Sequence, residues 1–163
     1  MPAASGTSTG AGFVVTLSFK DAIDGDSIAF KMDGERFKTN SRTLKFAADS
    51  RYKIIVETKP NIEFHHLHVG GSDLALMSDE PSRVGSYVAE WNTTGIAASK
   101  RGAREDVLFN LQGPGGLLRQ KLQCKFYKKS DSHASWGHKM SGLEWTCAQD
   151  SAGNIAVTEE KVK

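Results

Sequence analysis

Three histidines, His65, His66 and His68, are the first residues of this chain whose type and spacing could hold a metal ion. Because side chains alternate along a strand, His66 and His68 should share one face, a spacing that suits zinc. His133 or His138 could supply a third ligand, but the sequence contains neither a Cys-x-x-Cys nor a His-Glu-x-x-His motif. Paired histidines are common on solvated strands, so the pattern favours a surface without a metal.

Asp21, Asp24 and Asp26 flank Gly25 and are the next candidates, here for calcium. Calcium loops of the EF-hand type need a fixed ligand spacing and a closing bidentate glutamate, and this segment has neither. Aspartate and glycine tolerate the left-handed conformations of tight turns. A hairpin turn is therefore the simpler interpretation of this segment.

Covalent catalysis requires a nucleophile, a base and an orienting group, and the sequence shows no such set. It has no Gly-x-Ser-x-Gly elbow, and Cys124 lies at an inward position of an expected strand. The glycine-rich run at 113–116 is followed neither by Gly-Lys-Ser/Thr nor by a helical pattern that would cradle phosphate. We therefore expect a non-enzymatic protein without a cofactor or metal.

A period of two dominates the rest of the chain and indicates strands with one apolar and one polar face. In the longest run Leu118, Leu122, Cys124 and Phe126 share one face, while Arg119, Lys121, Gln123 and Lys125 share the other. Such runs cover residues 13–19, 28–32, 44–46, 52–56, 87–91, 107–111, 118–126, 143–147 and 155–157. Turn residues separate most of them, which predicts an all-β fold: one antiparallel barrel or sandwich filled by side chains, with at most short helical turns.

The dipeptide Asp33-Gly34 carries the sharpest turn signal, because a type I′ hairpin needs positive φ at both central residues. Counting outward from that turn pairs Met32 with Glu35 and Phe30 with Phe37. The two phenylalanines would then meet across the strands.

Length and composition favour a single soluble domain. We expect a flexible leader at 1–12, the barrel domain at 13–158 and a charged tail at 159–163. A net charge of +2 with interspersed acidic residues does not favour nucleic acid as a partner. Cys124 and Cys147 fall on inward positions and are expected to be buried thiols, and the chain shows no signal or membrane-spanning pattern. These features predict a cytoplasmic protein.

Partner-binding residues are sought among aromatic and basic side chains near expected loops. Lys100, Arg101 and Arg104 form the densest basic cluster, which indicates either a solvated loop or a contact for an acidic peptide or anionic lipid. Trp136 lies in a polar connector at 130–139 and either plugs an end of the barrel or anchors a partner. The contact candidates are Tyr87, Trp91, Lys100, Arg101 and Trp136.

Several short runs, unremarkable alone, stand in an order and spacing that resemble one known family. They are Asp33-Gly34-Glu35-Arg36-Phe37, Arg42-Thr43-Leu44-Lys45, Tyr52-Lys53-Ile54-Ile55-Val56, Lys59-Pro60, Val69-Gly70-Gly71, Glu80-Pro81, Thr94-Gly95, Lys125-Phe126-Tyr127, His133, Trp136-Gly137, Glu144 and Cys147. The chain resembles a divergent member of the type-1 cannabinoid receptor-interacting protein family, roughly from Phe13 to Cys147.

The resemblance implies a small cytoplasmic, non-enzymatic protein that binds the intracellular C-terminal tail of a cannabinoid-type G-protein-coupled receptor and modulates its coupling to G proteins. It would reach the plasma membrane only through its partner. The implied fold is a filled antiparallel β-barrel, similar in shape to the lipid-binding domain of Rho GDP-dissociation inhibitors. An extended tail could add to a free strand edge through main-chain hydrogen bonds.

The alternative is a carrier or chaperone for a lipidated segment of a signalling protein, and G-protein subunits are possible partners of this kind. A carrier needs an open apolar cavity. Large residues at inward positions argue against such a cavity, because a barrel filled by side chains leaves little room. They are Phe30, Phe37, Phe46, Phe109, Phe126 and Trp145.

Overall fold

The computed structural model describes residues 12–33, 41–78, 85–100, 103–114 and 116–163. These residues form strands joined by turns and one short 3-10 helix, so the predicted all-β fold is confirmed. The elements are β2 (Gly12–Asp21), β3 (Ala29–Asp33), β4 (Ser41–Ala47), β5 (Arg51–Lys59), β6 (His66–Val69), β7 (Ser72–Ala75), β8 (Met77–Ser78), β9 (Ser86–Asn92), β10 (Glu105–Gly113), β11 (Gly116–Tyr127), η1 (Ser132–Ser135), β12 (His138–Lys139), β13 (Leu143–Gln149) and β14 (Asn154–Val162).

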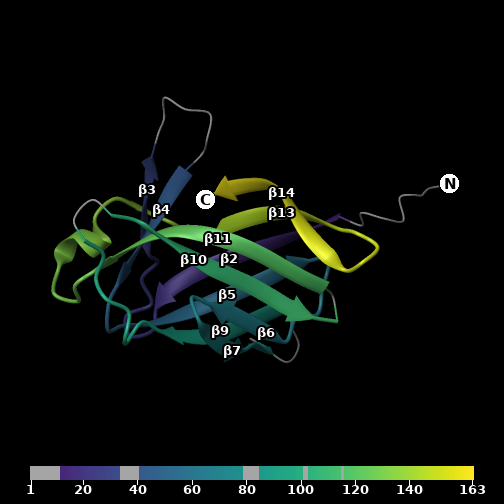
Figure 1. The fold of residues 1–163 in the computed structure, drawn as a ribbon, viewed down its shortest axis with the longest axis horizontal. Coiled ribbons are helices and arrows are strands. Elements are labelled where there is room, and N and C mark those ends of the chain that lie inside the picture. Colours follow the sequence, from purple (N-terminus) through teal and green to yellow (C-terminus); the bar gives the residue numbers. More distant parts are fainter. Residues whose placement is uncertain (1–11, 34–40, 79–84, 101–102, 115) are drawn as a thin grey trace.

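The strands form one sheet that curls into a nearly closed barrel (Figure 1). Neighbouring strands run in the order β11–β14–β13–β2–β5–β9, while β10 pairs with the other edge of β11 and with β6. The segment 72–78 connects the two ends of this strand order, because β7 pairs with β6 and β8 pairs with β9. Between these two strands the amide of Leu76 donates to the carbonyl of His65 at 2.9 Å.

Two short parallel pairs interrupt the otherwise antiparallel sheet, and both involve the same edge of β11. Residues 124–127 of β11 pair with 44–47 of β4, and residues 117–118 pair with 154–155 of β14. Between these pairs β4 and β14 diverge, so residues 119–122 have no strand partner on that edge in the described part of the chain.

Inward side chains of β4 and β14 close the gap where these strands diverge. Arg42 is 8% exposed and its Nη2 forms an ion pair with Oε2 of Glu160. Trp145 donates its indole N–H to the same carboxylate oxygen at 2.8 Å. A charged pair, rather than apolar contact, therefore seals the barrel at this point.

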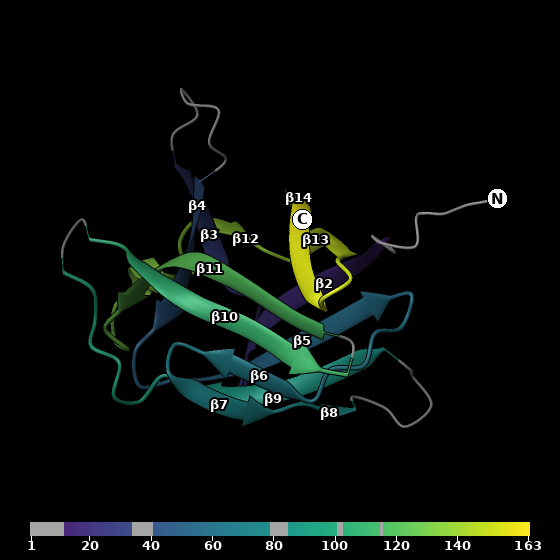
Figure 2. The ribbon, with the colours of Figure 1, turned by 45° about the vertical axis from the view of Figure 1, so that its right-hand side comes forward.

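The β3–β4 hairpin projects from the barrel as an arm (Figures 1 and 2). Asp33 pairs with Ser41 and Phe30 pairs with Leu44. The prediction of a two-residue turn at Asp33-Gly34 is therefore wrong, because residues 34–40 separate the paired strand ends. The expected contact of Phe30 with Phe37 fails with it, since Leu44 occupies the position opposite Phe30 and Phe37 lies outside the described residues.

An aromatic cluster fills one part of the interior, with Phe46 at its centre. The Phe46 ring lies 5.4 Å from Phe19, 5.1 Å from Tyr52 and 5.1 Å from Trp91, all edge-to-face. Such pairs stabilise a fold by about 0.5–1.5 kcal/mol beyond the burial of their area. Of the inward residues named above, Phe46, Phe109, Phe126 and Trp145 are at most 2% exposed, which confirms the filled interior, and Phe30 packs against the core while partly exposed.

Strand β14 includes residues 159–162 of the expected charged tail at 159–163. Its residue Val162 pairs with Leu143, and the amide of Lys163 donates to the carbonyl of Gly142 at 2.8 Å. The boundary expected after residue 158 therefore falls within this strand. Of the expected leader, residues 1–11 lie outside the described residues and Gly12 begins β2.

Candidate functional site

Three lysines form a row on the outer face of neighbouring strands β3, β4 and β11. Lys45 and Lys125 point outward because Leu44, Phe46, Cys124 and Phe126 occupy the inward positions. The parallel register places Lys45 directly beside Lys125. Lys31 pairs with Thr43 and is thus diagonal to Lys45. We call Lys31, Lys45 and Lys125 the lysine row.

The lysine row concentrates positive charge, and Asp131, whose charge acts on Lys125, is a nearby carboxylate. None of its members forms an ion pair with a carboxylate of the described residues. Burial lowers the pKa of Lys45, and the charges of Lys31 and Lys125 lower it further. Like charges placed side by side on a sheet repel one another and are destabilising. An anion that covers this face would reduce the repulsion among the lysines.

Tyr127 lies at the end of β11 between two of these ammonium groups. Its ring centroid is 5.8 Å from Nζ of Lys45 and 5.2 Å from Nζ of Lys125. Ammonium groups at this distance are attracted to the negative face of an aromatic ring. The pKa of Tyr127 is raised by burial and also by the charge of Asp131, so the phenol stays neutral at physiological pH. The ring therefore adds an aromatic surface to the lysine row without cancelling its charge.

The connector after β11 presents Trp136 next to the lysine row. Asp131 caps η1 by accepting the amide of His133 at 2.9 Å, and its carboxylate contacts Nδ1 of the same histidine at 2.6 Å. The hydrogen bond that the Asp131 carboxylate accepts from the backbone N–H of His133 is the main reason that the pKa of Asp131 is lowered. The His133 and Trp136 rings lie 4.0 Å apart, and Nζ of Lys45 donates to the Trp136 carbonyl at 2.7 Å. Capping, ring contact and the lysine bond together fix the position of Trp136.

Trp136 is 56% exposed, so it does not plug the barrel. Gly137 turns the chain directly after it, with φ of +114°, and leads into the pair of His138 with Phe30. A Cβ atom at Gly137 would lie 3.0 Å from the Phe30 carbonyl oxygen, so the close approach favours glycine. The turn leaves the indole exposed at the outer surface, beside the lysine row.

Of the five predicted contact residues, Trp136 lies at this face, and Lys100 is exposed in the loop before β10. Ser99 places that loop, because its hydroxyl accepts the amide of Phe126 and its own amide donates to the Phe126 carbonyl. Lys100 therefore follows a residue bonded to the C-terminal part of β11, on the edge opposite β4. Arg101 lies outside the described residues.

The other two predicted contact residues are wrongly assigned, because both are buried. Trp91 is 1% exposed and packs edge-to-face against Phe46 and Phe126. Tyr87 is 9% exposed, and its hydroxyl donates to the Ile62 carbonyl at 2.9 Å. Both rings occupy inward positions of β9, where a partner cannot reach them.

The sequence analysis did not identify the lysine row or Tyr127 as site residues, although it did place one of the lysines on an outward face. The polar side of the longest apolar–polar run already contained Lys125. The sequence carries no signal for the parallel pairing of β4 with β11, which brings Lys45 next to it.

The remaining polar clusters have structural explanations. His66 and His68 alternate with buried Leu67 and Val69, and the described residues contain no group of three potential metal ligands. Asp21 accepts the amides of Ile23 and Asp24, which is the turn expected for this segment.

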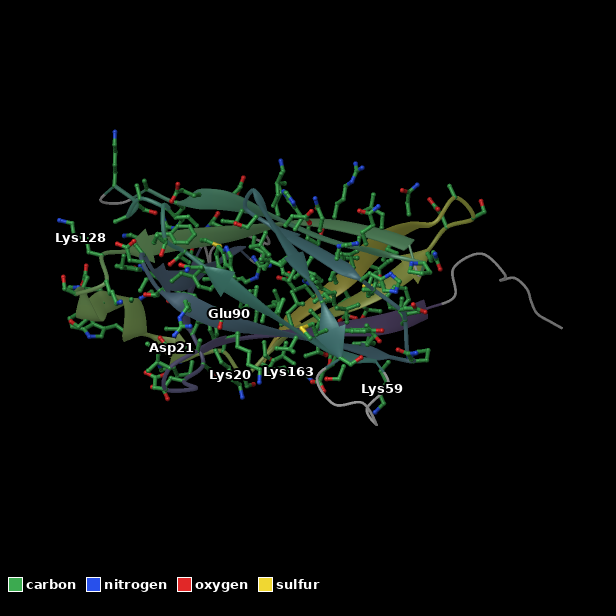
Figure 3. All side chains as sticks on the ribbon, turned by 90° about the horizontal axis from the view of Figure 1, so that it is seen from below. Lys20, Asp21, Lys59, Glu90, Lys128 and Lys163 are labelled. Carbon is green, nitrogen blue, oxygen red and sulfur yellow. The ribbon has the colours of Figure 1, made fainter. Side chains whose placement is uncertain are left out.

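A polar cleft of about 600 Å³ lies on another wall, lined in part by Glu57, Lys59 and Glu144. Figure 3 shows Lys59 and Lys128 at opposite ends of the barrel, which separates this cleft from the connector that begins after β11. Glu144 is engaged by Nζ of Lys163 at 2.8 Å. The cleft therefore has no continuity with the lysine row.

No helix in the described ranges is long and apolar enough to cross a membrane. A search of curated proteins finds no match to this chain. Residues 9–162 match the family described as CB1 cannabinoid receptor-interacting protein 1, which is nearly the whole chain. The chain therefore belongs to the CB1 cannabinoid receptor-interacting protein 1 family.

Proposed function

We propose that this chain is a non-enzymatic cytoplasmic adaptor that binds the intracellular C-terminal tail of a cannabinoid-type G-protein-coupled receptor and modulates its signalling. Membership of the family supports a receptor of this kind as the partner. The observation that carries the proposed site is the lysine row, three cations that form no ion pair with a carboxylate of the described residues, beside the exposed ring of Trp136.

The lysine row and Trp136 complement an extended tail that contains acidic residues. Carboxylates of the tail would neutralise the row, which speeds encounter and selects against basic partners. Trp136 offers a large apolar surface that is already fixed in place, so little conformational freedom is lost when a partner covers it. Binding would recruit the adaptor to the plasma membrane through its receptor, and an occupied tail is less accessible to other signalling proteins.

Strand addition is the binding mode that this face allows. Strand β12 pairs with β3 only at Ala29 and Phe30. Beyond that pair, residues 31–33 of β3 have no strand partner on the same side within the described ranges. An extended tail could hydrogen-bond to this edge in the line of β12, passing between Trp136 and Lys31.

The alternative, a carrier for a lipidated segment or a G-protein subunit, gains no support from the core. A carrier requires an apolar cavity of several hundred Å³ on the scale of ligand sites, on the order of 300 Å³ or more. The inward rings of Phe46, Phe109 and Trp145 are at most 1% exposed and pack against their neighbours. An acyl chain would have to displace these contacts.

The experiment that tests the proposal is titration of the protein with a fluorescent peptide of the receptor tail, followed by anisotropy. Replacing Lys125 by glutamine should weaken binding about fivefold, because one exposed ion pair contributes up to about 1 kcal/mol. The matched control is Lys53→Gln, since Lys53 is exposed and its strand register places it on another wall, between Lys20 and Glu90. Equal affinities for wild type and both variants would refute the site, and absence of binding to any tail peptide would refute the function.

A further inference from the structure

A second hollow lies on the outer face of β10 and β11. It has a volume of about 660 Å³ and is lined by Leu108, Asn110, Arg119, Gln120 and Lys121. Leu108 is 48% exposed because its neighbours in β10 take the inward positions. The register places Lys121 directly opposite Leu108 and Arg119 opposite Asn110. An exposed leucine thus lies among cations on a sheet surface.

The hollow and the lysine row lie on the same side of one continuous strand. Arg119, Lys121, Lys125 and Tyr127 are separated by even numbers of residues, so their side chains share the outer face of β11. At about 3.4 Å per residue, Lys121 is about 14 Å from Lys125, and the span from Arg119 to Tyr127 is about 27 Å. Figure 2 shows β10 and β11 side by side, and they pair from Gly116 to Cys124 of β11.

The charge pattern along this face is bipartite. Arg119 and Lys121 form no ion pair with a carboxylate of the residues described. Between them and the lysine row lies Gln123, which donates to Thr43 at 2.7 Å. Asp106, exposed and directly opposite Gln123, places a negative charge there. Arg104 also lies there, because its Nε donates to the same Thr43 hydroxyl at 2.9 Å. Two cationic sites are therefore separated by a short stretch in which one cation and one anion offset each other.

We infer that the hollow is a second docking site for the same acidic segment that binds the lysine row, an inference that rests on the proposed function. The occupant is an extended peptide of at least eight residues. Its acidic residues pair with the lysine row and, further along the segment, with Arg119 and Lys121, and an apolar side chain covers Leu108. An uncharged residue of the peptide lies over Asp106.

The divided charge pattern selects a peptide over a membrane as the occupant. An anionic bilayer presents uniform negative charge, which gains no net attraction at the centre of the face, where the charges of Asp106 and Arg104 offset each other. A peptide can place charge at two positions and leave the middle neutral. A leucine in a hollow between two cations also fits a single side chain better than a flat surface.

Joining two weak contacts in one peptide makes the second contact intramolecular, and affinity then rises by a factor of about 100 or more when the spacing matches. The first and last residues of a four-residue peptide are only about 10 Å apart, which is less than the distance from Lys121 to Lys125, whereas those of a ten-residue peptide are about 31 Å apart. Peptide length therefore separates one docking site from two.

The experiment compares two sets of synthetic probes by anisotropy. The short probe is a peptide of four glutamates. The two long probes are ten-residue peptides with glutamates at both ends and uncharged serines between them. One long probe carries a leucine near its first residue and the other carries it near its last residue. We expect at least one ten-residue peptide to bind at least tenfold more tightly than the short one. The double variant Arg119→Gln with Lys121→Gln should remove this advantage and leave the affinity of the short peptide unchanged. Asp106→Asn should tighten binding of the longer peptide.

Leu108→Asn provides a second variant, and melting curves verify that each outward substitution leaves the fold intact. Equal affinity for the short and long peptides, or a long peptide unaffected by both hollow variants, would overturn the inference. If Lys125→Gln still weakens the short peptide, the proposed function survives that failure. If Lys125→Gln also has no effect, the proposed site fails as well. Binding to phosphatidylserine vesicles that depends on Arg119 and Lys121 would assign the hollow to a membrane and overturn the peptide inference.

Discussion

Replacing Glu160 by glutamine should lower the free energy of unfolding by about 2 kcal/mol. Glu160 pairs with Arg42, which is 8% exposed, across the gap where β4 and β14 diverge. Glutamine keeps an oxygen that can accept the indole N–H of Trp145. What it removes is the negative charge, so the guanidinium of Arg42 is left uncompensated in a nearly dry position.

The magnitude follows from how deeply each partner is buried. Breaking a fully buried ion pair costs about 3–5 kcal/mol, because the remaining charge has lost its hydration. Here the Glu160 side chain is 24% exposed, so water reaches one side of the pair and reduces the cost. A hydrogen bond to a charged group contributes about 1.5–3 kcal/mol, which brackets the expected value.

Urea unfolding of four proteins measures this prediction: the wild type, Glu160→Gln, Arg42→Met and the double variant. Each single variant leaves one polar group of the pair without its partner, whereas the double variant leaves no uncompensated charge. The double variant should therefore be less destabilised than the sum of the single ones, with a coupling of about 1–3 kcal/mol. Glu159→Gln is the matched control, because Glu159 is exposed on the same strand. Additive single effects, or a loss below about 0.5 kcal/mol for Glu160→Gln, would show that the pair does not seal the barrel.

Three further predictions concern buried thiols, a crowded glycine and the exposed indole. Burial raises the pKa of Cys147 to about 11 and raises that of Cys124 further, so iodoacetamide at pH 8 should label neither thiol until urea unfolds the protein, as mass spectrometry would show. Both thiols ionise more readily in the unfolded chain, so they should make stability fall as pH rises above about 8.5, a decline that should be smaller when both are replaced by alanine. Gly113→Ala should lower the free energy of unfolding in urea by at least about 2 kcal/mol, because the new Cβ would lie 2.7 Å from the Glu63 carbonyl oxygen. The control Gly153→Ala meets open space and should lower it by only about 1 kcal/mol, because of the positive φ at that position. Acrylamide should quench Trp136 fluorescence in the folded protein, and Trp136→Phe should abolish most of that quenching because Trp91 and Trp145 are at most 1% exposed.

The alternation of apolar and polar residues was sufficient to predict nine strands and their inward residues, but its runs do not cover the short strands β6, β7, β8 and β12. It succeeds because a strand buried on one face has no freedom to shift by one residue without exposing its apolar side chains. Phe46, Phe126 and Trp145 are buried as the pattern predicts. The same pattern places Trp91 at an inward position. The selection of Trp91 as a contact residue therefore disagreed with the alternation of its own strand.

Features that depend on pairing between distant strands were not predictable in this way. The turn signal at Asp33-Gly34 is local, but the register of β3 with β4 is set by the whole hairpin and its contact with β11. The lysine row likewise exists only because β4 runs parallel to β11, which joins Lys45 to Lys125 across 80 positions of sequence. The alternation within β4 and within β11 does not indicate that these two strands are neighbours rather than partners of other strands.

Lys45 and Lys125 differ in what they contribute, although they lie side by side. Nζ of Lys45 donates to the Trp136 carbonyl, so this lysine both holds the indole in place and adds charge. Lys125 contacts the ring of Tyr127 and forms no ion pair with a described carboxylate, so its main contribution is charge. An anion near Lys125 would lower the repulsion on Lys45 and strengthen its bond to the connector. If the proposed acidic partner binds at Lys125, its charge and the position of Trp136 are therefore coupled through Lys45.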